Sequence, residues 1–106
     1  MSASSSQEAA AIVRVRIPTV LQSYTSGKAE VFVAVPVLAP ELPPTLGGVL
    51  AALDGSYHGI RFRMIDEQGA VRPHIKLFVD HALTRDLRSP IPADATVMIV
   101  GALSGG

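Results

Sequence analysis

The sequence predicts an α+β fold in which a mixed sheet of four to five strands carries one main helix on one face. Three observations predict it. Several short segments have the period-two alternation of half-buried strands, and one segment has apolar residues at helical spacing. These segments follow one another in the order strand, strand, helix, strand, short strand, strand. Such an order buries one shared core when the helix covers a single face of the sheet.

Two strands and the turn between them predict an N-terminal hairpin. The first strand covers residues 12–17, where apolar side chains alternate with two arginines, and Pro18 ends its pairing. Residues 22–28 form a polar, glycine-containing turn. The second strand covers residues 29–35, with its valines facing inward. Two alternating runs joined by a short loop favour antiparallel pairing.

The main helix is predicted to follow a segment that prolines keep irregular. Residues 36–44 contain four prolines. Thr45 then offers an N-cap, and we expect Gly55 to end the helix. Apolar residues recur between them at helical spacing: Leu46, Val49, Leu50 and Leu53. Gly47 and Gly48 each weaken a helix by about 1 kcal/mol relative to Ala, so we expect them to permit close packing against the sheet.

The second half of the sequence predicts the rest of the sheet. A short helical piece is expected within residues 57–65, and residues 75–79 alternate as a third strand. Residues 80–81 read as a tight turn into a short fourth segment at 82–85. Residues 96–100 are apolar on both faces, which is typical of a central strand covered on both sides.

Length and composition indicate one domain between two tails. The chain has 106 residues, enough for one hydrophobic core. We expect a Ser-rich disordered tail at residues 1–11, a folded domain at 12–100 and a flexible tail at 101–106 that ends in a glycine pair. The apolar fraction of 48% is high for so short a chain, which points to a surface that docks on a partner.

Charge and residue usage exclude several classes of function. Nine basic residues balance nine acidic ones, so no strong field favours nucleic acid or an anionic membrane. There is no Cys, and therefore no disulfide, thiolate metal site or cysteine nucleophile. No apolar run approaches the roughly 20 residues of a membrane span, and the N-terminal stretch lacks the features of a signal peptide. These observations agree with a cytoplasmic protein.

The order of elements, the Thr-Leu helix start and the ending of an apolar strand followed by Ala-Leu-Ser-Gly-Gly resemble the ubiquitin-like β-grasp sulfur carriers of the MoaD/ThiS family. The resemblance covers residues 12–106. Residues 76–83, Lys-Leu-Phe-Val-Asp-His-Ala-Leu, look like the turn between that family's third and fourth strands, although Asn is common where Asp80 and His81 stand. Residues 17–21, Ile-Pro-Thr-Val-Leu, look closest to the carrier branch of bacterial cysteine synthesis.

The resemblance implies a carrier that is not itself an enzyme. A ubiquitin-activating-like partner would use ATP to adenylate the Gly106 carboxylate, and a sulfur donor would displace AMP to leave a thiocarboxylate. The sulfur would pass to an accepting enzyme, either cysteine synthase-like or the large subunit of a molybdopterin synthase. The chain would need no cofactor of its own. Gly105 and Gly106 would keep the end of the tail slim.

Partner binding is expected to involve the tail and one face of the sheet. An extended tail from Val100 to Gly106 spans about 20 Å at roughly 3.3 Å per residue. Leu103 would be its apolar anchor, and Ser104 is small enough not to obstruct it. The sheet face opposite the helix is expected to dock the partner, since aromatic and Arg side chains are common interface anchors. By the alternation, that face carries Arg14, Arg16, Phe32, Lys76, Phe78 and Met98.

Other functions remain open at this point. The alternatives within the same fold are the small subunit of a molybdopterin synthase and a ubiquitin-like modifier that forms isopeptide bonds with lysines. It also fits a β-grasp interaction module in which the glycine end is incidental. His58, His74 and His81 lie in separate segments, so we expect no metal site. A Ser56, His58 and Asp54 triad is disfavoured because neighbours in one loop face one another poorly. We expect a monomer when the chain is free.

Overall fold

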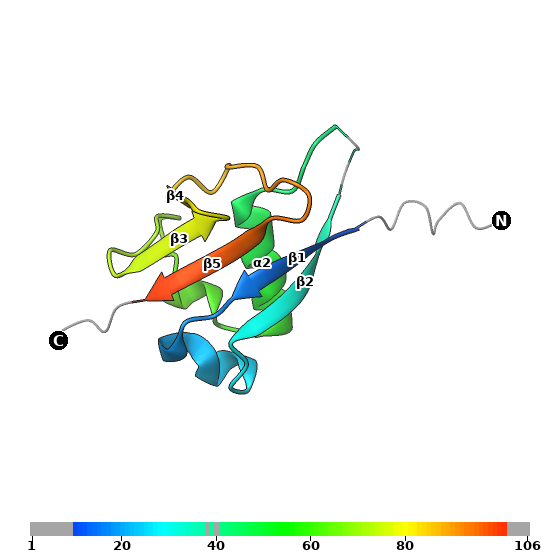
Figure 1. The fold of residues 1–106 in the computed structure, drawn as a ribbon. Helices are drawn as coiled ribbons and strands as arrows, with labels where there is room; N and C mark the ends of the chain where they lie inside the picture. Colours follow the sequence, from blue (N-terminus) through cyan, green and yellow to red (C-terminus); the bar gives the residue numbers. More distant parts are fainter. Residues whose placement is uncertain (1–9, 38, 40, 102–106) are drawn as a thin grey trace.

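One mixed sheet and one main helix make up the fold in a computed structural model that describes residues 10–37, 39 and 41–101 (Figure 1). In chain order the elements are β1 (Ala10–Arg16), the 3-10 helix η1 (Thr19–Thr25), β2 (Glu30–Pro36), α2 (Leu46–Ser56), the 3-10 helix η2 (Arg61–Arg63), β3 (Ile75–Val79), β4 (Ala82–Thr84) and β5 (Thr96–Gly101). The strands of the described chain are ordered β2-β1-β5-β3-β4. No helix among these residues is both long enough and apolar enough to cross a membrane.

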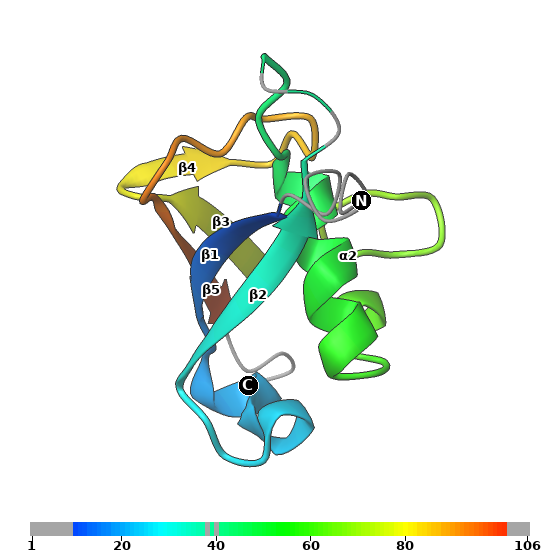
Figure 2. The same ribbon diagram turned by 90° about the vertical axis from the view of Figure 1, so that its right-hand side faces the viewer.

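Two antiparallel hairpins are joined through the last strand. β1 pairs with β2, and β3 pairs with β4. β5 lies between them, antiparallel to β3 and parallel to β1. Figure 2 shows α2 on one side of this sheet. The predicted α+β fold, with a mixed sheet and a helix on one face, is therefore confirmed.

The core lies between α2 and the sheet face that the alternation assigned to it. The inward side chains of β1 and β2 are buried, and their outward neighbours are exposed. The predicted helical apolar residues Leu46, Val49, Leu50 and Leu53 have no exposed surface. Thr45 caps the helix as expected, because its Oγ1 accepts a hydrogen bond from the Gly48 N–H at 3.1 Å.

The two helix glycines pack closely, but against different elements. A Cβ on Gly48 would lie 3.4 Å from Val35 Cγ1 on the sheet. A Cβ on Gly47 would lie 3.2 Å from the Leu87 carbonyl oxygen, in the loop before β5. The close approach to the sheet is therefore confirmed for Gly48, whereas Gly47 lets a loop pack on the helix.

Several predicted boundaries were wrong. Residues 22–25 of the predicted 22–28 turn belong to η1, whose Leu21 and Thr25 side chains are buried. Gly55 lies inside α2, which continues to Ser56 and closes when the Tyr57 N–H bonds the Leu53 carbonyl. Nothing lies within 4 Å of a Cβ at Gly55, so no contact there ends the helix.

Other elements differ by smaller amounts. β1 begins at Ala10 and β5 extends to Gly101, so each is longer than predicted. Within the predicted 57–65 helical piece, only η2 is helical. The residues around η2 supply core side chains, namely Ile60, Met64 and Ile65.

β5 is central, as predicted, but only one of its faces is covered. Val97 and Ile99 are buried toward α2. On the other face Val100 is 39% exposed. Apolar residues on both faces of this strand therefore mark a sheet with an uncovered, partly apolar surface, and the prediction of double cover was wrong.

The end of β5 packs tightly on η1. Gly101 pairs with Ile75 in the sheet, and a Cβ at Gly101 would lie only 2.8 Å from Val20 Cγ2. Pro18 Cγ would lie 3.7 Å from the same position. The absence of a Cβ at Gly101 therefore lets the end of β5 lie against η1.

Removing the helix cap tests the start of α2. We expect Thr45→Ala to lower the free energy of unfolding by about 1 kcal/mol, because the Gly48 N–H loses its acceptor. Thr45→Ser keeps the hydroxyl and should retain most of the stability. Urea unfolding followed by circular dichroism measures both; equal losses in the two variants would contradict the cap.

Adding a methyl group tests the contact at the end of β5. Gly101→Ala should lower the free energy of unfolding by about 1–3 kcal/mol, since the new Cβ overlaps Val20. In a Val20→Ala background the same change should cost clearly less. A double-mutant cycle measures the difference, and additive effects of the two substitutions would show that the contact is not tight.

Candidate functional site

The predicted reactive tail begins where the described chain ends. Gly105 and Gly106, predicted as the working residues, and Leu103 and Ser104, predicted as partner contacts, lie outside the described residues. What the structure describes is the attachment of this segment, at Gly101 on the central strand β5. The site is therefore built here from β5, its neighbours and η1.

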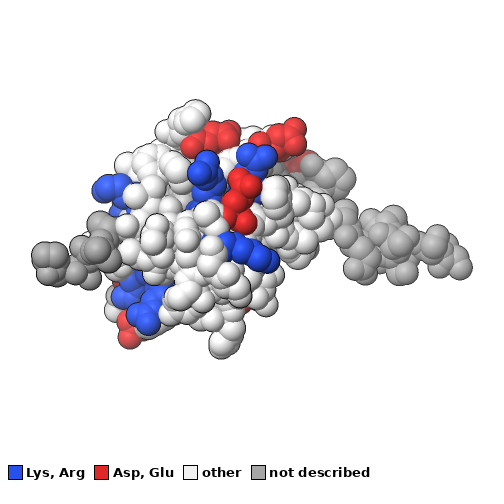
Figure 3. Space-filling view, turned by 60° about the horizontal axis from the view of Figure 1, so that its bottom comes forward, with Lys and Arg blue, Asp and Glu red and all other residues white. Residues whose placement is uncertain are grey.

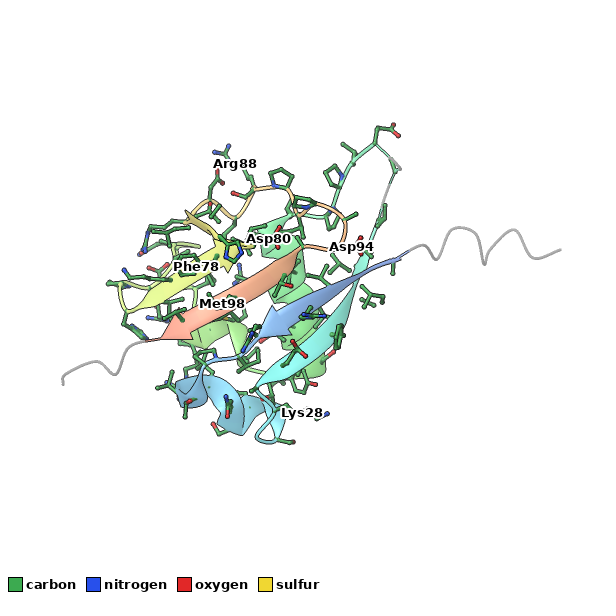
Figure 4. All side chains as sticks on the ribbon, in the orientation of Figure 1. Lys28, Phe78, Asp80, Arg88, Asp94 and Met98 are labelled. Carbon is green, nitrogen blue, oxygen red and sulfur yellow. The ribbon has the colours of Figure 1, made fainter. Side chains whose placement is uncertain are left out.

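The predicted docking residues of the sheet do lie on one face. Register places Arg14 opposite Phe32 on β1 and β2, and Phe78 opposite Met98 on β3 and β5. Arg16 pairs with Met98 across the parallel contact. Figure 4 labels Phe78 and Met98 on adjoining strands. All of these residues point away from α2, as the alternation predicted.

Arg14 is held in place by its two neighbours on β2. Its Nε lies 3.4 Å from Glu30 Oε2, and its guanidinium carbon lies 5.7 Å from the centre of the Phe32 ring. Both partners are exposed enough that the ion pair adds little stability. Its effect is to order a long side chain beside an aromatic ring that is 61% exposed.

The other half of the face, on β3 and β5, is partly apolar. Phe78 and Met98 are half-buried, and Lys76 opposes Val100 in register. In the view of Figure 3, several basic side chains lie beside acidic ones, and most of the remaining described surface is uncharged. The face therefore combines aromatic, aliphatic and basic side chains, and Glu30 pairs with one of its arginines, Arg14.

A hollow beside the tail attachment was not predicted. It measures about 440 Å³ and lies between η1 and the end of β5. Arg16, Met98 and Val100 line it from the sheet, and Val20 and Gln22 line it from η1. No sequence pattern predicts this hollow, because it forms where two segments that are distant in sequence meet.

A second aromatic–arginine group joins η1 to η2. Arg63 Nε donates a hydrogen bond to the Tyr24 hydroxyl, which raises the pKa of Arg63 above its ordinary value. The guanidinium carbon of Arg72 lies 4.6 Å from the centre of the Phe62 ring, and its Nε donates to the Phe62 carbonyl oxygen at 2.8 Å. These contacts fix the loop that follows α2.

The side chains that could bind a metal ion or act in catalysis lie in separate parts of the described structure. His58 and His81 are exposed and His74 is half-buried, each in a different segment. Asp54 Oδ1 accepts hydrogen bonds from the Gly59 and Arg61 N–H groups, so this carboxylate stabilises the backbone of the segment that follows α2. Within residues 10–101, apart from 38 and 40, no group of three His, Asp or Glu side chains is placed to hold a metal ion.

Comparison with known proteins identifies similar structures. No protein-family model matches the sequence, and neither does any curated protein. The crystal structure of Mycobacterium tuberculosis CysO, an antigen, is 27% identical, with a TM-score of 0.72 over 86% of this chain and 99% of that one. A chain of the Amycolatopsis orientalis BexX/CysO complex is 23% identical, with a TM-score of 0.72 over 89% and 99%.

An archaeal structure has the same fold. SAMP1 of Haloferax volcanii is 20% identical, with a TM-score of 0.70 over 90% of this chain and 99% of that one. The last two likenesses establish the fold, and CysO adds sequence similarity to it. Together they show that this chain has a ubiquitin-like β-grasp fold, as the sequence resemblance implied.

Proposed function

We propose that this protein is a sulfur carrier whose working group is the Gly106 carboxylate. The observation that carries the proposal is the position of the tail attachment. Gly101 ends the central strand, beside an uncovered sheet face that holds Arg14, Arg16, Phe32 and Phe78. A partner that docks on this face would meet the tail at its edge. The domain would thus present the tail, and the partner would supply the catalysis.

The proposed chemistry activates a poor electrophile in two steps. A carboxylate oxygen of Gly106 attacks the α-phosphorus of ATP in a ubiquitin-activating-like enzyme, and pyrophosphate leaves. A sulfide sulfur then attacks the acyl carbon of the adenylate, and AMP leaves with the bonding electron pair. Loss of the sulfur proton leaves a thiocarboxylate, which is a strong nucleophile near neutral pH. None of these steps requires an acid, base or metal from the carrier.

The length of the tail suits this division of roles. Because β5 includes Gly101, five residues remain beyond it, and they reach at most about 17 Å at roughly 3.3 Å per residue. The nucleotide site of the partner must therefore lie close to the part of the partner's surface on which η1 and the sheet face of the carrier dock. The hollow beside Val20 and Gln22 would lie at that junction.

A second candidate is protein modification through the same carboxylate. The similarity to SAMP1, which is named small archaeal modifier protein 1, favours it. Both functions begin with adenylation, and they differ in the nucleophile that takes the acyl group. A sulfide gives the carrier, whereas a lysine amine gives an isopeptide conjugate.

The mass of the intact chain tests the proposed terminus. Incubation with the adenylating partner from the same cells, ATP and sulfide should add one sulfur-for-oxygen exchange. Deletion of Gly106 should abolish this gain, and deletion of Ser2, at the other end, should leave it unchanged. A gain that survives loss of Gly106 would reject the thiocarboxylate, and high-molecular-weight conjugates in cells would favour the modifier.

Two exposed phenylalanines provide a matched test of the docking face. Phe32 is 61% exposed on the proposed face, and Phe62 is 58% exposed on η2. We expect Phe32→Ala to lower kcat/KM for adenylation of the chain by about tenfold or more, because it removes an aromatic interface anchor. Phe62→Ala should have little effect. ATP–pyrophosphate exchange measures both, and equal effects would place the interface elsewhere.

A further inference from the structure

The two edges of the sheet are unequal. β4, at one edge, has three residues, whereas β2, at the other, has seven. Proteins usually protect a long edge strand with several charges, a proline or a covering segment, because its unpaired backbone groups attract another strand. Glu30 is the only charged residue of β2, and Pro36 is its last residue. In the described chain, no strand lies outside β2.

The register identifies the backbone groups that face outward from this edge. The Ile17 N–H donates to the Ala29 carbonyl oxygen at 2.8 Å, which makes this pair a hydrogen-bonded one. Hydrogen-bonded and non-hydrogen-bonded pairs alternate along an antiparallel ladder. The N–H and C=O groups of Glu30, Phe32 and Ala34 therefore point away from β1. They repeat at the spacing that another extended strand would match.

An apolar groove lies along the same edge. It measures about 650 Å³ and lies between the end of β2 and the first turns of α2, which run side by side in Figure 2. Its walls include Val35, Pro36, Leu42, Pro43, Ala51 and Ala52, and none of the described residues that line it is charged. Small side chains on α2 keep it open, and Leu42 is 57% exposed at its rim.

We infer that the outer edge of β2 binds an extended segment of a partner protein as an additional strand, with an uncharged, apolar side chain in the groove. An extended peptide satisfies both features, because its backbone pairs with the edge while alternate side chains turn toward α2. A helix has no free backbone groups to offer the edge. Pro36 lacks an N–H, so pairing ends beside the groove. The edge adjoins the docking face at Phe32, whose backbone lies on the edge and whose side chain lies on that face, but the groove is formed by other residues and does not depend on the tail chemistry.

Selection from a library of random peptides tests the inference. The peptides have seven residues, matching the length of β2, and are selected on the full chain. Enriched peptides should have apolar residues at alternate positions. In NMR spectra they should shift the amide resonances of Phe32, Ala34, Ala51 and Ala52. Failure to enrich any peptide, or shifts confined to other surfaces, would overturn the proposal.

Matched substitutions on the two edges locate the binding. Leu42→Arg places a charge at the rim of the groove. Leu83→Arg places the same charge on β4, at the opposite edge of the sheet, where the leucine is 56% exposed. We expect Leu42→Arg to weaken binding of the selected peptide by about tenfold or more and Leu83→Arg to leave it unchanged. Circular dichroism checks that both variants fold. Equal binding by both variants would reject the groove as the site.

A second copy of the chain is the competing occupant. Sedimentation of the free chain distinguishes it, since self-association that Leu42→Arg abolishes would assign the edge to a homodimer and overturn the proposal. The tail assay supplies an independent control. Leu42→Arg should still gain sulfur at Gly106, so failure of the peptide site and failure of the carrier function give different results.

Discussion

The pairing of β5 with both β1 and β3 is the interaction on which the rest of the molecule depends. Each hairpin alone is too small to be stable in water. β5 joins them, with Val15 opposite Val97 on one side and Leu77 opposite Ile99 on the other. All four side chains are buried toward α2. The same strand carries the tail, so the contacts that complete the core also fix where the tail leaves the domain.

Residues with a strict period of two were the most predictable part of the fold. In β1 and β2 the alternation of valines with polar or exposed residues determines both the strands and the side that faces α2, because a one-residue shift would bury Arg14. The same logic predicted the shared face of Phe32, Phe78 and Arg16. Thr45 was predictable because an N-cap depends on local backbone geometry.

Features that depend on tertiary contacts were not predictable. η1 has only two buried residues, which are too few to form a repeating apolar pattern that could be recognised in the sequence. A glycine such as Gly55 is a sequence signal for the end of a helix, but no neighbouring residue in the structure comes close enough to require a glycine there. The hollow at Val20 and the groove at Leu42 arise where segments distant in sequence meet, and no pattern within either segment encodes them. The tail residues beyond Gly101 remain predictions from sequence alone.

The inequality of the sheet edges limits how far such a molecule can assemble. A protein whose sheet can pair with other strands at both edges can add a neighbouring molecule at each edge and grow into an open filament. Here the three-residue β4 offers too short a template at one end, and β2 supplies the single long edge. Strand addition is therefore self-limiting: one partner, or one symmetric mate, saturates the sheet. A domain with a partly apolar sheet face can in this way carry an open edge without polymerising.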